Sequence, residues 1–224
     1  MITLDRRVSR GRLGTRRAQR GGHERLRASD VLLLGWLAEQ YGAPATQLEP
    51  LLDRGERTVQ RTVARLRGAG LVQVVRILVG EGAWVIPTTA GVRAAGYGFP
   101  GWRPRVGLLA HVAAVNEVRL HIQSASPDTE WVSERLLLGE RTGGEHLPDG
   151  LAIADAQRIA IEVELTVKSR RRTEAILDEL AARFDAVVYF CAPGPHRLLS
   201  VLEASGRWPR LSVRPLPAPF APRP

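Results

Sequence analysis

Apolar residues recur along the chain with two different periods, and each period predicts a different kind of element. In the first third of the chain they return every three or four positions, which predicts three short helices. Their ranges are 29–42, 45–53 and 55–70. Ser29 or Asp30 is expected to cap the first of them. Residues 71–89 form two β-branched runs on either side of Gly80-Glu81-Gly82, a pattern that predicts a β-hairpin.

Three helices followed by a hairpin is the order of a winged helix-turn-helix domain, and TVQRTVARLRGAGLV resembles its recognition helix and the turn into its wing. After Glu56, no acid stands at helical spacing to neutralise the arginines on the outer face of this helix. This favours contact with DNA over two alternatives, a solvated face and a protein-binding module. The candidate DNA-binding residues are Arg57, Thr58, Gln60, Arg61, Arg65 and, in the wing, Arg76.

A Gly- and Pro-rich linker over 99–105 separates this first domain, residues 29–98, from a second domain over 106–213. Before the linker, Thr88 or Thr89 is expected to cap a short helix. The pattern of the second domain predicts a helix over 108–123, strands over 130–140, 146–155 and 158–167, a helix over 171–184, a strand over 186–190 and a helix over 196–205. This order predicts a mixed α/β domain with a central sheet.

The strand predicted over 158–167 alternates strictly between an apolar and a polar face. Its polar face carries Glu162, Glu164 and Lys168, the only lysine among 32 basic residues. The two glutamates lie ~6–7 Å apart at a rise of ~3.3 Å per residue. If the preceding strand brings Asp149 alongside, three carboxylates converge, and such hard oxygen ligands suit Mg²⁺ or Mn²⁺. The alternative is a solvated edge strand whose charges merely prevent aggregation.

The same residues carry a resemblance to a known nuclease fold. Pro148-Asp149, a spacer of twelve residues and Glu162-Val163-Glu164 resemble the motif of the PD-(D/E)xK nuclease superfamily. Together with the predicted winged helix, the TTAG segment and the helix that holds His111 and Glu117, they look like the replication-relaxation family, over about residues 29 to 200. That family is found on mobile elements and is linked by name to plasmid replication and DNA relaxation.

The resemblance implies a metal-dependent DNA endonuclease or nickase. Its candidate catalytic residues are Asp149, Glu162, Glu164, Lys168 and Glu117, and the ligands of Mg²⁺ or Mn²⁺ are Asp149, Glu162 and Glu164. Glu117 matches the acid that several of these enzymes carry on the first core helix. Glu164 departs from the pattern, because most members have lysine there, although some restriction enzymes cut DNA with glutamate. Lys168, roughly 13 Å along the strand if the strand continues, would have to reach back.

Composition places the chain among folded proteins with a basic arm. Its 224 residues are 44% apolar, enough to bury a core, and no run of about eighteen apolar residues predicts a membrane span. A single cysteine, Cys191, and the lack of a signal-peptide pattern indicate the cytoplasm. Residues 1–28 hold nine arginines and two acids, 9 − 2 = +7 of the net charge of +9. This predicts a disordered arm that binds nucleic acid, or a solubilising tail, while 214–224 predict an extended proline-rich tail.

Two hypotheses of different classes follow. The first is a DNA-binding protein of a mobile element with a Mg²⁺-dependent endonuclease domain, in which Arg170, Arg171 and Arg172 contact the DNA backbone unless they form only a solvated helix start. The second is a non-enzymatic DNA-binding regulator or accessory factor with a degenerate nuclease-like fold. The expected partners are double-stranded DNA, replication or transfer proteins and a second copy of the chain, on the nucleoid or a plasmid. His146 could assist at Asp149, but the five scattered histidines receive little weight.

Overall fold

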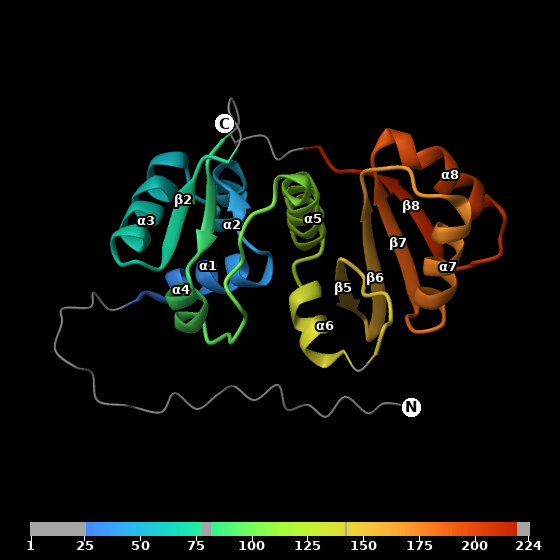
Figure 1. The fold of residues 1–224 in the computed structure, drawn as a ribbon, viewed down its shortest axis with the longest axis horizontal. Coiled ribbons are helices and arrows are strands. Elements are labelled where there is room, and N and C mark those ends of the chain that lie inside the picture. Colours follow the sequence, from blue (N-terminus) through green and yellow to red (C-terminus); the bar gives the residue numbers. More distant parts are fainter. Residues whose placement is uncertain (1–25, 78–81, 142, 219–224) are drawn as a thin grey trace.

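The computed structural model describes residues 26–77, 82–141 and 143–218 and shows an α/β protein with two sheets (Figure 1). The smaller sheet has three strands in the order β1-β3-β2, and the larger has five in the order β4-β5-β6-β7-β8. The predicted arm over 1–28, apart from its last three positions, and part of the hairpin turn lie outside the described residues. Within the described ranges, no helix is long and apolar enough to cross a membrane.

The first unit contains the helices and the hairpin that the apolar pattern predicts. Its elements are α1 (Ala28–Glu39), β1 (Ala43–Pro44), η1 (Ala45–Gln47), α2 (Leu48–Leu52), α3 (Glu56–Gly68), β2 (Val72–Val75), β3 (Trp84–Pro87) and α4 (Thr89–Ala94). Thr88 caps α4, because its hydroxyl accepts a hydrogen bond from Gly91 N at 3.1 Å. The cap predicted for α1 is wrong. The helix begins at Ala28, and Asp30 in its first turn accepts a hydrogen bond from Arg27 N at 2.8 Å.

The orientation of α3 follows from its apolar stripe. Val59, Val63 and Leu66 recur at helical spacing, are buried and pack with leucines of α1 in the core of the first unit. The opposite face of α3, which carries the predicted arginines, therefore points outward. In Figure 1, α3 lies at the end of the molecule farthest from the five-stranded sheet.

The second unit follows the predicted order with two corrections. Its elements are α5 (Val106–Ala125), β4 (Glu130–Ser133), α6 (Glu134–Glu140), β5 (Gly150–Ala154), β6 (Gln157–Glu164), α7 (Arg170–Ala181), β7 (Ala186–Cys191), α8 (Pro193–Ala204) and β8 (Leu211–Pro215). The strand predicted over 130–140 ends at Ser133, and its remainder is α6. β8 was not predicted, and it takes in Arg214 and Pro215, the start of the predicted tail.

Helices cover both faces of the five-stranded sheet. β4, β5 and β6 are antiparallel, whereas β6, β7 and β8 are parallel. Ile161 and Val163 pack against α5 on one face, and Ala160 belongs to the core that α7 and α8 complete on the other. Since side chains alternate along a strand, Glu162 and Glu164 lie on the Ala160 face. The alternative of a solvated edge strand is therefore wrong, because β6 is the middle strand and both glutamates are buried.

α5 packs against both units. Leu109 and Val112 contact the apolar cluster around Trp84 and Ile86 of the first unit, while other residues of the helix lie on the five-stranded sheet. Figure 1 shows α5 between the two sheets. The predicted domain boundary thus falls beside a helix that both cores share.

Buried polar side chains join the two units as well. The Gln47 amide donates to Ala113 O at 2.8 Å, and the Asn116 amide donates to Gly42 O at 3.0 Å. Arg135 Nη1 donates to Ala38 O at 2.7 Å. Buried polar groups need partners of this kind, and these partners lie across the interface, so the contacts fix how the two units meet.

Candidate functional site

Asp149 and Glu162 lie side by side where β5 begins and β6 ends. We call these two acids, with the basic side chains that contact them and the neighbouring Glu164, the Asp149 centre. Asp149 directly precedes β5, whose Gly150 pairs with Ile161 of β6, so that Asp149 lies beside Glu162. One Asp149 oxygen, Oδ2, accepts a hydrogen bond from Val163 N at 2.7 Å. The other, Oδ1, lies 2.8 Å from Nε2 of His111 on α5. The pairing of β5 with β6 therefore brings Asp149 beside Glu162, which is the condition on which the predicted convergence of acids depended.

Glu162 is almost completely buried, with 3% of its surface exposed. Its Oε1 lies 3.0 Å from His146 Nε2. Burial raises the pKa of Glu162 to about 7, the negative charge of Asp149 adds to the rise, and the contact with His146 opposes it. This carboxyl group therefore changes its protonation near neutral pH.

Glu164 and Lys168 form an ion pair at the end of β6, with 2.5 Å between Lys168 Nζ and Glu164 Oε2. The other carboxylate oxygen accepts hydrogen bonds from Thr166 N at 3.3 Å and Thr166 Oγ1 at 3.4 Å. The strand ends at Glu164, so the chain turns and returns Lys168 to the acid. The displacement of roughly 13 Å required a strand that continues to Lys168, and β6 does not continue that far, so Lys168 contacts Glu164 directly.

The two histidines that contact these carboxylates are more exposed than the carboxylates themselves. The side chains of His111 and His146 are 36% and 30% exposed, compared with 18% for Asp149 and 4% for Glu162. Burial lowers the pKa of His111, but Asp149, Glu162 and Glu134 outweigh it, so that the pKa is raised. The hydrogen bond to Glu162 raises the pKa of His146. The five histidines share no spacing in the sequence that indicates a site. Only the position of His146, three residues before Asp149, pointed to a role beside that acid.

A residue of the first unit also contacts the second unit close to Asp149. Tyr41 Oη lies 3.3 Å from Glu134 Oε2 at the start of α6. Burial raises the pKa of Glu134, and the nearby charge of Asp149 raises it further. A pocket between the units is lined by Glu39, Gln40, Tyr41, His111, Val112, Val115, Glu134 and Asp149. Neither Tyr41 nor Glu134 was predicted as a site residue.

Glu117, the acid predicted on the first core helix, lies at the interface between the two units. Its Oε1 accepts a hydrogen bond from Gln47 Nε2 of the first unit at 2.7 Å. Its Oε2 is buried without a hydrogen-bond partner among the described residues. The acid expected on the first core helix therefore belongs to the interface between the units and makes no contact with the Asp149 centre in the described structure.

The predicted metal ligands do not form one converging set. Within residues 26–77, 82–141 and 143–218, no group of three or more His, Cys, Asp or Glu side chains is arranged to hold a metal ion. Each predicted ligand instead contacts a basic side chain of its own: Asp149 contacts His111, Glu162 contacts His146, and Glu164 contacts Lys168. An ion bound by all three carboxylates would have to displace these contacts, so this arrangement does not fit a three-carboxylate site.

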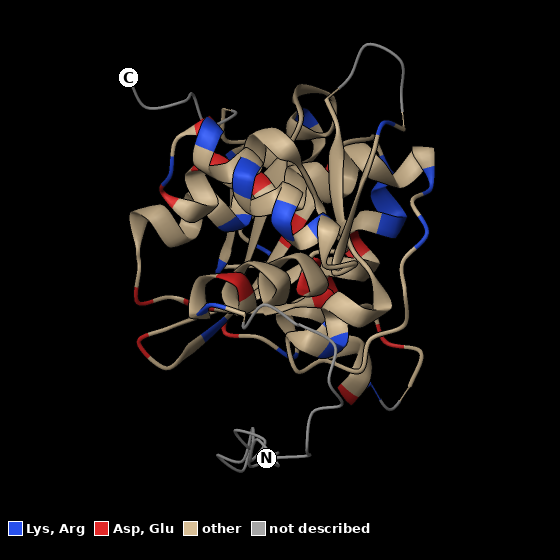
Figure 2. Cartoon of the chain, turned by 90° about the vertical axis from the view of Figure 1, so that its left-hand side faces the viewer, with Lys and Arg blue, Asp and Glu red and all other residues tan. Residues whose placement is uncertain are grey.

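The outer face of α3 carries most of the predicted DNA-binding residues in exposed positions. Arg57, Thr58, Gln60 and Arg61 are exposed, and Gln60 also donates to Glu56 at 2.8 Å. In the described part of the chain, neither Arg57 nor Arg61 forms an ion pair with an acid. Figure 2 views the molecule from the α3 side and shows basic positions recurring on the helices there.

Arg65 differs from its neighbours, because it pairs with Asp30 of α1, whose side chain is 1% exposed. Burial alone would raise the pKa of Asp30, but hydrogen bonds from Arg65 and from Arg27 N lower it on balance. Arg65 is thus held by a buried acid that the sequence pattern of α3 could not reveal. Arg76, after β2, is exposed.

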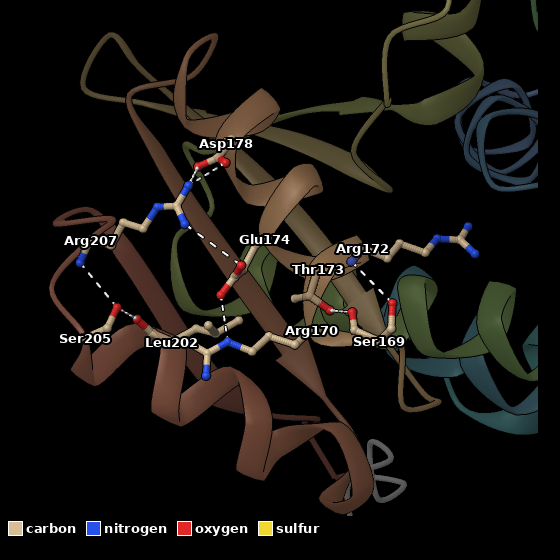
Figure 3. Close-up of polar contacts among 9 residues, drawn as sticks. All are labelled: Ser169, Arg170, Arg172, Thr173, Glu174, Asp178, Leu202, Ser205 and Arg207. Atoms are coloured by element: carbon tan, nitrogen blue, oxygen red, sulfur yellow. Dashed lines mark hydrogen bonds and ion pairs between the residues drawn. The ribbon is translucent and has the colours of Figure 1, made fainter.

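The arginines at the start of α7 also divide into two kinds. Arg170 pairs with Glu174 at 2.7 Å. Near it, Arg207, which follows α8, pairs with Asp178 at 2.7 Å, so the surface shown in Figure 3 is largely neutralised. Arg171 and Arg172 are exposed, and the described residues offer them no ion pair. In Figure 3 the Arg172 guanidinium points away from this network.

Comparison with known proteins adds little. No family model matches the sequence, and no curated protein matches it. A solved structure described as "PigF with SAH" shares 16% identity, covers 84% of this chain and has a TM-score of 0.22. The match spans 57% of the length of that neighbour. A likeness this weak carries no argument about function.

Proposed function

We propose that this protein binds double-stranded DNA through the outer face of α3, acting as the recognition helix of a winged-helix domain. The observation that carries the proposal is the pair Arg57 and Arg61, which lie one helical turn apart, are exposed and have no acidic partner in the described structure. The order of helices and hairpin in the first unit supports it.

The chemistry of this face suits a duplex. Guanidinium groups bind phosphate and release counterions, which gives affinity without reading sequence. Arginine and glutamine can also form paired hydrogen bonds with guanine and adenine edges in the major groove, so Arg61 and Gln60 could contribute specificity. Arg76 would contact the backbone from the wing. In this proposal the protein acts as a DNA-binding accessory factor in replication or transfer, in keeping with its resemblance to the replication-relaxation family.

The experiment is duplex binding measured by fluorescence anisotropy over a range of salt concentrations. We expect Arg57→Ala/Arg61→Ala to weaken binding by roughly tenfold or more and to reduce the slope of log affinity against log salt by about two. Arg170→Ala/Arg207→Ala is the matched control, because it removes the same charge from arginines that are already paired. Equal losses in the two variants would overturn the proposal.

A second candidate function is a metal-dependent endonuclease at the Asp149 centre. The observation in its favour is that Asp149, Glu162 and Glu164 lie at neighbouring strand ends with Lys168 beside them. The pairing of each acid with a basic side chain favours the non-enzymatic function.

Nicking of supercoiled plasmid tests this second candidate directly. The wild type is incubated with Mg²⁺ or Mn²⁺ alongside Asp149→Ala and Glu162→Ala. Cleavage that disappears in both variants establishes the nuclease. If the protein binds DNA but does not cleave it with either ion, the nuclease function is ruled out and the non-enzymatic accessory function remains. A cut through both strands would require two centres and hence a homodimer, which sedimentation of the complex with DNA would detect.

A further inference from the structure

Gln60 differs in chemistry from the two arginines beside it on the outer face of α3. Arg57 and Arg61 are exposed and present only hydrogen-bond donors, because a guanidinium has no acceptor. An amide carries a donor nitrogen and an acceptor oxygen side by side. Gln60 is exposed as well, and the exposed Ala64 one turn further along is small, so it leaves room beside the amide. The middle of this face therefore carries a group that both accepts and donates.

The acid at the start of α3 holds the Gln60 amide in one orientation. Gln60 Nε2 donates to Glu56 Oε1 at 2.8 Å, across one turn of the helix. Because a carboxylate accepts but does not donate, this contact requires the nitrogen of the amide, and not its oxygen, to face Glu56. One of the two Nε2 hydrogens is thereby committed, and the other remains. Gln60 Oε1 accepts no hydrogen bond from the residues that the structure describes.

A base edge that fits this amide must supply one acceptor and one donor next to each other. In the major groove, adenine presents the N7 acceptor beside the N6 amino donor. Guanine presents two acceptors, cytosine offers its N4 amino donor, and thymine has an O4 acceptor beside a methyl group. Guanine would require two donors from Gln60, and one of the Nε2 hydrogens is already held by Glu56. Adenine is therefore the base that satisfies both remaining positions of the amide.

We propose that Gln60 reads an adenine in the major groove and that Glu56 is the positioning residue that sets this preference. Gln60 Nε2 donates its second hydrogen to adenine N7, and Gln60 Oε1 accepts from the adenine amino group. The neighbouring Arg61 is also held by its own helix, since its Nε donates to Arg57 O at 3.3 Å, which leaves its terminal nitrogens for the duplex. This role of Gln60 rests on the proposed binding of duplex DNA by α3 and adds the base that one side chain recognises.

The test begins with selection of bound duplexes by the full-length protein from a library whose central segment is randomised. We expect the wild type to enrich an adenine at one position. Anisotropy titrations then compare the selected duplex with duplexes that carry another base pair there, and we expect these to bind roughly tenfold or more weakly. Replacing the adenine by 7-deazaadenine, which lacks N7, or by purine, which lacks the amino group, should each remove part of the preference.

Two variants separate reading from positioning. Gln60→Ala should bind all of these duplexes about equally, because both contacts to the base are lost. Glu56→Ala keeps the amide but frees its orientation, so the preference for adenine over guanine should fall several-fold, although overall affinity stays level or rises with the loss of an acid near the phosphates. Glu49→Ala is the matched control and should keep the preference, because it removes an acid from α2 that makes no hydrogen bond to Gln60 in the described structure.

A preference that survives in Gln60→Ala would overturn the proposal, as would an unchanged ratio of affinities for adenine and guanine in Glu56→Ala or an equal fall in Glu49→Ala. A cytosine preference that is lost in Glu56→Ala but kept in Gln60→Ala would overturn it too, because Glu56 would then contact the base itself. Duplexes that bind without any adenine dependent on Gln60 would reject this role and leave DNA binding by α3 intact. No binding to any duplex would reject the proposed function, and this role with it.

Discussion

The outer face of α3 and the Asp149 centre both collect charge, but they treat it in opposite ways. On α3, Arg57 and Arg61 are exposed and have no acidic partner in the described ranges. At the centre, Glu162 and Glu164 are buried, and each contacts a basic side chain. Exposed unpaired charge remains available to a polyanion, whereas buried paired charge is already satisfied. The regular spacing of charged residues in the sequence therefore identifies one face of a helix or strand. The elements packed around that face determine whether its charges are free to bind a ligand.

The largest expected effect comes from Arg65, which lies on α3 but behaves like the buried pairs. Asp30→Ala removes its carboxylate partner and the acceptor for Arg27 N. We expect the free energy of unfolding to fall by about 2–3 kcal/mol, because the ion pair of the buried Asp30 with Arg65 and the hydrogen bond from Arg27 N are both lost. Urea denaturation measures this. Glu56→Ala removes the partner of Gln60 on the exposed side and should cost less than ~0.5 kcal/mol. If Asp30→Ala and Glu56→Ala lower the free energy of unfolding equally, the ion pair of Arg65 contributes no more to stability than an exposed contact does.

The next effect is a pH dependence that originates at Glu162. Its pKa rises from 4.5 to about 7 on folding, so the folded state binds more protons between these values than the unfolded state. This stability is fully present below the unfolded pKa and is lost as pH rises through about 7. The raised pKa of His146 acts in the same direction, while the lowered pKa of Asp30 matters only in acid.

We therefore expect the wild type, with a chelator present, to lose about 2 kcal/mol of unfolding free energy between about pH 5 and pH 8. Glu162→Gln cannot ionise, so its stability should change much less over this range. Denaturant unfolding at several pH values makes the comparison. A wild-type stability that stays level or rises between these pH values would contradict a raised pKa of Glu162.

A smaller effect is expected at the Glu164–Lys168 pair. Lys168→Met retains most of the side-chain length but leaves the buried Glu164 Oε2 without its cation. The hydrogen bonds from Thr166 remain, so we expect a loss of only about 1 kcal/mol in unfolding free energy. Arg170→Met is the control, because its pair with Glu174 is exposed and should contribute less than ~0.5 kcal/mol. Identical losses would mean that burial does not distinguish the two pairs.

Local periodicity predicted the regular elements whose residues alternate clearly. The helical stripe of α3 and the alternation in β6 both appear in the structure. α6 was missed because a short apolar run in ERLLLGE fits either a strand or a helix, although Ser133 and Glu134 offered a helix-start signal. β8 was missed because it pairs with β7 across the intervening helix α8, and because it ends in Pro215 at the start of the proline-rich segment.

The candidate site was predictable only where its residues lie on paired strands. The pairing of β5 with β6 brought Asp149 beside Glu162. The contact of His111 with Asp149 spans 38 residues, and that of Tyr41 with Glu134 spans 93, so neither leaves a pattern in one sequence. The burial of Glu162 also depends on α7 and α8, which pack over its face of the sheet. Non-local packing therefore determines what the acids can do.

The smallest expected effect concerns Arg172, which shares its helix with paired arginines but has no acidic partner in the part of the chain that the structure describes. Arg172→Ala should weaken duplex binding about two- to threefold if DNA also passes over the start of α7, because one phosphate contact is lost. Arg170→Ala should change affinity less, since Glu174 already neutralises that side chain. Anisotropy titrations at low salt resolve this difference. If neither substitution changes affinity while the α3 variant does, the duplex is confined to the first unit, and unpaired charge alone does not define a DNA-binding surface.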